Sequence, residues 1–348
     1  MNLSRRLFLM GGSGSLAAVA ASDRIAVGLI GAGGRGRLLA RSFQQDPAVR
    51  IAAVCDVYEP NLEEGLSVAK AGGQAARAYR DYRKLLEDRD IAAVIVATPE
   101  HWHHRMVLDA LAAGKDVYVE KPLCRTPEEG VELVEAERRS KNVVQVGMQR
   151  RSYDLYLAGR KLVASGILGK VRMVRSWWLN NYLEPDGDVK LAGPLDWEQW
   201  QGPVEPRVPL NPYLFRHWRN FSAYSGGIVA DQGAHVYDGI HLLMNASYPL
   251  AVTAAAGKPH KPGVDTPESV VVTAEYPEDF IGPMMAEEFT RNGIDAQYGS
   301  ATYQPLGDGF EYDVSITQDA LIARPTEATK QKIQTQAYPG FKPIGSDN

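Results

Sequence analysis

Short apolar runs alternate with amphipathic stretches along the first part of the chain. Five runs have the length of strands buried on both faces, at residues 24–30, 51–55, 92–97, 116–119 and 143–147. Helical spacing predicts helices over residues 34–45, 61–71, 82–87, 103–113 and 127–141. Because right-handed crossovers through helices join parallel strands, we predict a doubly wound α/β domain with a parallel sheet over residues 23–148.

After residue 150 the pattern changes to that of a sheet with one covered face. Stretches with a period of two residues predict strands over 171–178, 251–256 and 269–276, and helical spacing predicts a helix over 229–244. We predict a C-terminal α+β domain with a mainly antiparallel sheet over residues 149–348. Residues 179–225 form a long Pro-rich insertion without periodicity, and the last residues show only short strand-like stretches and one short helix, at 327–334.

A glycine-rich loop follows the first apolar run, with the sequence Gly31-Ala32-Gly33-Gly34-Arg35-Gly36. In the G-x-G-x-x-G pattern, Gly31 permits a tight turn, Gly33 lets the backbone approach a pyrophosphate, and Gly36 lets the next helix pack closely. Gly34 and Arg35 begin that helix, whose N-terminal N–H groups face the phosphates. The loop predicts a Rossmann-type dinucleotide site.

Asp56 ends the second apolar run, twenty residues after Gly36. A carboxylate at this place holds the ribose hydroxyls and repels the 2′-phosphate of NADP, so the sequence favours NAD. Arg35 and Arg37 keep NADP open as the less favoured cofactor. The alternative for Asp56 is a turn residue at the end of a strand.

Four further motifs carry a resemblance to a known family: Glu120-Lys121-Pro122, Thr98-Pro99-Glu100-His101-Trp102-His103, Val144-Gln145-Val146-Gly147 and residues 226–235. Together with the glycine-rich loop, they resemble the glucose-fructose oxidoreductase, inositol dehydrogenase and rhizopine-catabolism (Gfo/Idh/MocA) family. The resemblance implies an NAD-dependent oxidoreductase that transfers a hydride between nicotinamide and a hydroxyl carbon of a sugar or polyol.

The resemblance also implies residue roles. Lys121 is expected near both the nicotinamide and the substrate, and Asp231 and His235 match the family's D-x-x-x-H, in which the histidine exchanges the proton of the substrate hydroxyl. The cofactor contacts implied by the other motifs come from Thr98, Pro99, His101, Glu120 and Lys121.

The chemistry agrees with these roles, because an alcohol loses a proton as its hydride leaves, and an imidazole titrates near neutrality. Asp231 and His235 are four residues apart on the predicted helix, so we expect them on one face, where the carboxylate fixes the tautomer of the histidine. A surface lysine at 121 and a core histidine at 235 are the alternatives.

No metal is expected. Zinc sites do use His and Asp, and two groups of such residues have a spacing that could suit a metal site. Hydride transfer, however, needs no metal. The first group is Asp231, His235, Asp238 and His241, and the second is His101, His103 and His104.

Three functions remain open. The first is the dehydrogenase, and the second is a glycoside hydrolase that uses bound NAD for transient oxidation, elimination, hydration and re-reduction. The third is a sugar-binding protein with a vestigial site, favoured by the atypical C-terminal segment. Five of the six tryptophans fall between residues 177 and 218; they suit either sugar stacking or attachment of the long insertion to the sheet.

Composition excludes several classes of protein. The 348 residues suffice for two domains, and a net charge of -4 with a pI of about 6.0 does not suit a nucleic-acid-binding surface. No apolar stretch is long enough to span a bilayer. With only Cys55 and Cys124, no disulfide framework is expected, and the oligomeric state, including a homo-oligomer, stays open.

Residues 1–22 are expected to be a targeting signal rather than part of the folded protein. Residues 4–9, Ser-Arg-Arg-Leu-Phe-Leu, precede a weakly apolar stretch and the small-x-small sequence Ala18-Val19-Ala20. This order resembles a twin-arginine export signal, which implies the export machinery as a partner and an extracytoplasmic or periplasmic location. Because such export carries folded proteins and NAD is scarce outside the cytoplasm, the cofactor is expected to be tightly bound.

Overall fold

The computed structural model describes residues 24–73, 75–183, 189–259, 263–290, 300–305, 312–316 and 321–325. The expected export segment at 1–22 and the helix expected at 327–334 lie outside these residues. The described chain divides into two compact units, one with the residues up to Gly147 and Lys190–Pro212, the other with Met148–Val189 and the residues from Tyr213 onward. The predicted boundary after 148 lies beside this division, but Lys190–Pro212 belongs to the first unit.

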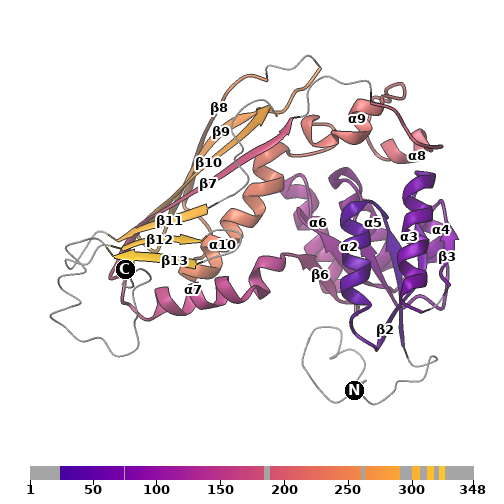
Figure 1. The fold of residues 1–348 in the computed structure, drawn as a ribbon, viewed down its shortest axis with the longest axis horizontal. Coiled ribbons are helices and arrows are strands. Elements are labelled where there is room, and N and C mark those ends of the chain that lie inside the picture. Colours follow the sequence, from indigo (N-terminus) through magenta and orange to yellow (C-terminus); the bar gives the residue numbers. More distant parts are fainter. Residues whose placement is uncertain are drawn as a thin grey trace, which may run out of the picture. The chain divides into compact units, whose positions relative to one another are not determined.

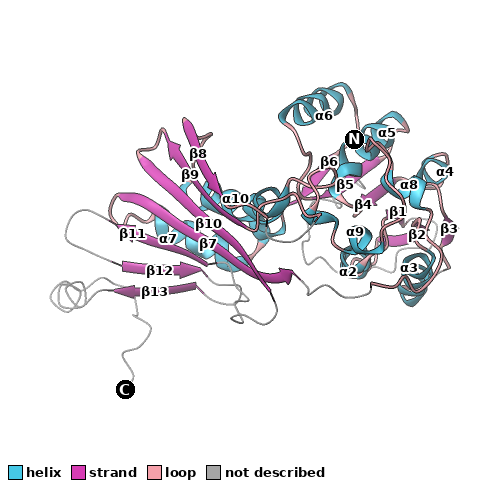
Figure 2. Cartoon of the chain, turned by 90° about the horizontal axis from the view of Figure 1, so that it is seen from above, coloured by secondary structure: helices cyan, strands magenta, loops and turns pink. Residues whose placement is uncertain are grey.

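The first unit, whose residues up to Gly147 are drawn in indigo to purple in Figure 1, is built on a parallel sheet with the strand order β3-β2-β1-β4-β5-β6, which can be followed in Figure 2. Its strands are β1 (Ile25–Ile30), β2 (Val49–Cys55), β3 (Arg77–Tyr79), β4 (Ala93–Val96), β5 (Asp116–Glu120) and β6 (Val144–Gly147). This confirms the predicted doubly wound fold. Only β3 was not predicted, because three largely exposed residues at a sheet edge carry no hydrophobic pattern.

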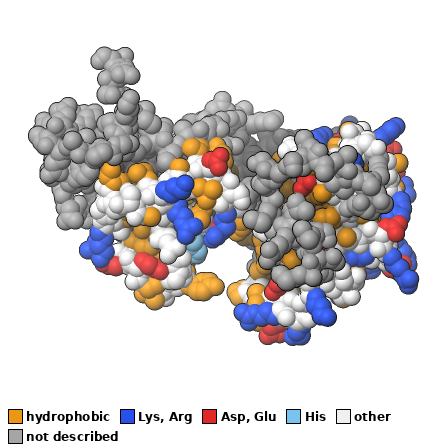
Figure 3. Space-filling model, turned by 90° about the horizontal axis from the view of Figure 1, so that it is seen from below, with side chains coloured by type: hydrophobic (Ala, Val, Ile, Leu, Met, Phe, Trp, Pro, Cys, Tyr) orange, Lys and Arg blue, Asp and Glu red, His pale blue; other side chains and the backbone are white. Residues whose placement is uncertain are grey.

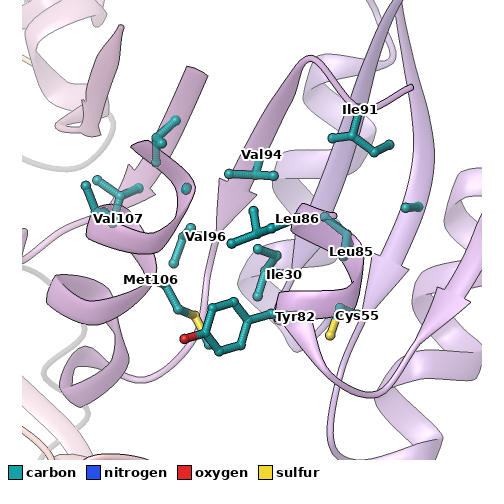
Figure 4. Packing of buried hydrophobic residues seen from close by; sticks show 14 of the residues in the cluster. Ile30, Cys55, Tyr82, Leu85, Leu86, Ile91, Val94, Val96, Met106 and Val107 are labelled. Atoms are coloured by element: carbon teal, nitrogen blue, oxygen red, sulfur yellow. The ribbon is translucent and has the colours of Figure 1, made fainter. Parts of the chain in front are cut away.

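Helices cover both faces of this sheet: α2 (Gly34–Phe43), α3 (Glu59–Ala71), α4 (Tyr82–Leu86), α5 (His103–Ala112) and α6 (Pro127–Arg139). One core cluster contains Leu39 of α2 and Leu62 of α3. The other contains Leu85 of α4, Met106 of α5 and Leu133 of α6, and Figure 4 shows its packing around Tyr82. A sheet buried on both faces explains why its strands are continuous apolar runs.

The second unit contains a sheet with the order β13-β12-β11-β7-β10-β9-β8, in which only β7 and β10 pair in parallel. The mainly antiparallel sheet is therefore confirmed. The strands are β7 (Val171–Leu183), β8 (Ala251–Ala256), β9 (Ser269–Tyr276), β10 (Phe280–Thr290), β11 (Ser300–Pro305), β12 (Tyr312–Ile316) and β13 (Leu321–Pro325). The last three show that the sheet continues into the C-terminal segment, where the sequence has only short strand-like stretches.

One face of this sheet packs against α7 (Asp154–Ala164) and α10 (Ala234–Met244), as Figure 2 shows. Val236 and Ile240 of α10 lie in one core cluster with Val272 of β9. The apolar side chains that gave residues 229–244 their helical spacing thus form the buried face of α10, whereas α7 was not predicted.

The predicted insertion is shorter than expected, because β7 extends to Leu183. It contains the short helices α8 (Trp197–Gln201) and α9 (Pro212–Arg216). The rings of Trp197 and Trp200 are buried and stacked, with 4.7 Å between centroids. For these two tryptophans the structure favours attachment of the insertion over sugar stacking.

The described surface is mixed in charge. On the face drawn in Figure 3, Lys and Arg side chains lie in small groups interspersed with Asp and Glu. Within the described ranges, no helix is both long enough and apolar enough to cross a membrane.

Candidate active site

Two glycines of the loop at the end of β1 are required by close packing. Gly31 has a φ of +86°, and a Cβ there would lie 2.8 Å from the carbonyl carbon of Ala97. A Cβ on Gly36 would overlap the carbonyl oxygen of Gly31. Because neither residue has a side chain, β1, the end of β4 and α2 can pack closely together. Gly31 and Gly36 are therefore needed for the conformation of the loop.

The other two glycines face open space. A Cβ on Gly33 would have its nearest neighbour at 3.9 Å, and one on Gly34 would meet nothing within 4 Å. Gly33 also occupies the N-cap position of α2, where it has no side chain to cover the first N–H groups of the helix. An uncovered helix N-terminus beneath open space fits the pyrophosphate of a dinucleotide.

Asp56 connects this loop to the end of β2. Its Oδ2 accepts a hydrogen bond of 2.7 Å from Ala32 N, and its Oδ1 accepts one of 2.9 Å from Tyr58 N. Burial raises the pKa of Asp56, while these N–H donors act in the opposite direction. The carboxylate therefore shapes the loop, and its contact with the ribose remains a prediction.

The two arginines that kept NADP open are both engaged within the chain. Arg35 Nε and Nη2 each lie 2.7 Å from Oε1 of the buried Glu120. Arg37 donates to Ala32 O at 2.8 Å and pairs with Glu64 at 2.8 Å. A guanidinium held by a carboxylate is a poor partner for a 2′-phosphate, so this geometry favours NAD.

A substitution at Asp56 tests this preference. We expect Asp56→Ser to weaken NAD binding about tenfold and to reduce the preference for NAD over NADP by at least a similar factor, because charge-assisted hydrogen bonds contribute about 1.5–3 kcal/mol. Dissociation constants from fluorescence titration measure both effects. Asp56→Asn is the matched control, since it keeps an acceptor for Ala32 N without the charge; an unchanged preference in both variants contradicts the assignment.

His103 joins the two loops that carry the Thr98-Pro99 and Lys121-Pro122 motifs. Its ring is buried, with Nδ1 2.7 Å from Pro122 O and Nε2 2.9 Å from Thr98 O. A neutral imidazole donates only one hydrogen bond, so a doubly protonated ring is needed to donate to both oxygens. His103 thus connects the backbone directly after the half-buried Lys121 to the loop that follows β4.

His101 lies among aromatic rings of the same unit. Its Nε2 is 2.8 Å from Trp200 O, and its ring meets the ring of Trp200 edge-on. The structure thus gives His101 a packing role, and its predicted contact with the cofactor remains a prediction.

In the second unit, Asp231 and His235 lie at the start of the predicted helix and both are buried. Val229–Gly233 forms a π-helical turn, and α10 begins at Ala234. Oδ2 of Asp231 lies 3.1 Å from Arg219 Nε and 2.6 Å from Gln232 Nε2. π-Helical turns are frequent at functional sites. The expected pairing of Asp231 with His235 remains a prediction.

Arg219 is a site residue whose role the sequence did not specify. Its guanidinium lies 4.1 Å from the centroid of the Trp218 ring and pairs with Asp231. The contact between Arg219 and a buried carboxylate depends on the folded chain and has no sequence signal.

The residues that suggested a metal are paired with other groups. Asp238 accepts from Arg151 at 2.6 Å, His241 lies 3.0 Å from Tyr276 Oη, and His104 lies 2.9 Å from Glu132. Among the residues that the structure describes, no group of three or more His, Cys, Asp or Glu side chains is arranged to hold a metal ion.

Two successive family models match most of the chain. The model of the oxidoreductase family with an NAD-binding Rossmann fold matches residues 25–148, and that of the Gfo/Idh/MocA C-terminal domain matches residues 156–298. The chain belongs to the Gfo/Idh/MocA family. Its first unit is the family's NAD-binding Rossmann domain.

Individual relatives match parts of this family member. Inositol 2-dehydrogenase from Rubrobacter xylanophilus is 35% identical over 170 residues, 47% of this chain and 46% of the relative. Glycosyl hydrolase family 109 protein 2 from Shewanella sp. strain ANA-3 is 36% identical over 130 residues, 36% of this chain and 28% of the relative. The chain thus spans less than half the length of these relatives.

Among solved structures, that of levoglucosan dehydrogenase in complex with NADH and levoglucosan matches with a TM-score of 0.64. The match covers 87% of this chain and 80% of that chain at 22% identity, which supports the fold alone.

Proposed function

We propose that this family member is an NAD-dependent dehydrogenase that oxidises a hydroxyl group of a sugar or polyol. The observation that carries the proposal is the glycine-rich loop, which leaves open space over the N-terminus of α2 in the unit that also positions Lys121. The names of the relatives, inositol 2-dehydrogenase among them, support the substrate class.

Each of the predicted site residues has a role in the proposed reaction. The glycine-rich loop and Asp56 bind and orient the cofactor, and NAD supplies hydride acceptance when it is bound. His235 takes the proton of the substrate hydroxyl, and Arg219 holds the Asp231 carboxylate in place. Lys121, fixed through His103, binds the hydroxyl oxygen as it becomes a carbonyl oxygen.

The test follows NADH absorbance and glycoside release together, with a panel of inositols, free sugars, levoglucosan and aryl glycosides. We expect NADH to form with a free sugar or polyol and no glycoside to be cleaved. Absence of both signals across the panel would instead favour a sugar-binding protein with a vestigial site.

A second candidate is the hydrolase that oxidises, eliminates, hydrates and re-reduces its substrate. The specific observation in its favour is the similarity to a glycosyl hydrolase family 109 protein. Glycoside release without net NADH in the same assay would establish this reaction and exclude the simple dehydrogenase.

We also propose that the protein is exported through the twin-arginine machinery with NAD tightly bound. The support is the order of the arginine pair, the weakly apolar stretch and Ala18-Val19-Ala20. Double replacement of Arg5 and Arg6 by Lys should leave the uncleaved chain in the cytoplasm. Export that continues unchanged would contradict the proposal.

We further propose that the protein forms a homo-oligomer. Tyr248, Leu250 and Val252, at and just before the edge strand β8, are 87%, 74% and 60% exposed. Exposed apolar side chains grouped at a sheet edge are typical of contact surfaces. Light scattering should give a multiple of the chain mass; a monomer at micromolar concentration would refute this proposal.

A further inference from the structure

The segment Lys190–Pro212, here called the clasp, belongs to the first unit although its neighbours in sequence belong to the second. Its first part binds the loop that follows β2. Asp196 N donates to Val57 O at 2.9 Å, and Glu59 N donates to Pro194 O at 3.0 Å. Tyr58 forms an antiparallel bridge with Leu195.

The hydroxyl of Tyr58 strengthens this attachment. Tyr58 is 2% exposed, and its Oη accepts a hydrogen bond of 2.8 Å from Ala192 N. This loop begins one residue after Asp56, the residue that contacts the glycine-rich loop. The first part of the clasp is thus attached directly beside the predicted ribose site.

The second part of the clasp binds the loop that follows β4. The carbonyl oxygen of Trp200 accepts from Trp102 Nε1 at 2.9 Å and lies 2.8 Å from His101 Nε2. Gly202, with a φ of +57°, packs so closely on the Trp102 indole that a Cβ would overlap the ring. This loop contains Thr98 and Pro99, two of the residues predicted to contact the cofactor.

The strand order shows which loops the clasp connects. β2 and β4 are the two neighbours of β1, and the glycine-rich loop follows β1. The clasp therefore connects the two loops that flank the glycine-rich loop at the carboxyl edge of the sheet, where a dinucleotide binds in this type of sheet.

We propose that the clasp retains the dinucleotide, because it prevents the loops after β2 and β4 from separating to release it. The inference rests on the proposed NAD-dependent function and deepens it, since it assigns cofactor retention to a segment outside the cofactor-binding motifs. The protein purified from its producing cell should then carry nucleotide through gel filtration.

The test measures nucleotide release rather than turnover. Gly202→Ala should displace the clasp from Trp102, because the added methyl group overlaps the indole in a backbone conformation that disfavours side chains. Gly114→Ala is the matched control: Gly114 lies in the same unit with a φ of +72°, but a Cβ there meets nothing within 4 Å. Each protein is loaded with NAD and diluted into an NAD-degrading enzyme, and loss of bound NAD is followed over time.

We expect Gly202→Ala to release NAD at least tenfold faster than the wild type, and Gly114→Ala to remain within twofold of it. Equal rates of NAD release from both variants would overturn the proposal that the clasp retains the dinucleotide. If Gly202→Ala does not fold, Tyr58→Phe, which removes the acceptor of the bond from Ala192 N, replaces it. Its control is Tyr82→Phe, another buried tyrosine whose hydroxyl instead bonds Asp109 at 2.6 Å. Release at the same rate from these two variants would equally overturn the proposal.

The outcomes separate this inference from the proposed function. A wild-type protein that binds no NAD refutes the cofactor-dependent function and the clasp with it. A wild-type protein that binds NAD, oxidises its substrate and releases the nucleotide as quickly as the Gly202→Ala variant refutes the clasp alone.

Discussion

Lys121→Met is expected to lower kcat for sugar or polyol oxidation about a hundred- to ten-thousand-fold, the usual contribution of one positioned proton-transfer or charged group. The reason is local: Lys121 follows β5, and the carbonyl of the next residue, Pro122, is held by His103. Methionine keeps most of the side-chain volume but removes the ammonium group, so the packing around the cofactor loops should persist.

The readout is kcat from NADH absorbance, together with the dissociation constant for NAD. Lys84→Met is the control in the same unit, because Lys84 pairs with Glu87 on an exposed helix surface and should leave both quantities unchanged. Retained NAD affinity with lost turnover supports a role in the chemical step. Full turnover in Lys121→Met would remove Lys121 from the active site.

The sequence predicted the first unit well because its strands are buried on both faces. An uninterrupted apolar run such as Ala93–Val96 is typical of a strand inside a parallel sheet. The helices between these runs begin and end close to the predicted residues. The second unit was harder to predict. Its sheet is covered on one face by α7 and α10, and the short strands β11 to β13 have no strong pattern of their own.

Contacts between residues distant in sequence account for most of what could not be predicted at the site. The spacing from Gly36 predicts a cofactor role for Asp56, but it does not predict the bonds that Asp56 accepts from Ala32 and Tyr58. Likewise, Arg35 lies in the expected loop, yet its partner Glu120 is 85 positions away. The attachment of Lys190–Pro212 to the first unit has no periodic signal, because it is made by backbone hydrogen bonds and by contacts with Tyr58, His101 and Trp102.

His235→Asn is expected to lower kcat to a similar extent as Lys121→Met, and in addition to change the pH dependence. A general base must be deprotonated to act, so activity of the wild type should fall as the pH decreases through the pKa of the base. Asparagine retains a hydrogen-bonding side chain but cannot take up the proton. The acidic limb of the kcat/KM profile that arises from His235 should therefore be absent from the residual activity of the variant.

His241→Asn is the matched control for this prediction, because both histidines lie on α10. Burial lowers the pKa of His241, and its ring bonds Tyr276 Oη at 3.0 Å. Loss of that bond should cost about 1 kcal/mol of folding free energy while kcat and its acidic limb persist. If His235→Asn only destabilises the protein as His241→Asn does, and the acidic limb survives, then His235 is a core histidine. The proton acceptor would in that case have to be sought among the other groups of the site, with the carboxylate of Asp231 disfavoured because it is held by Arg219.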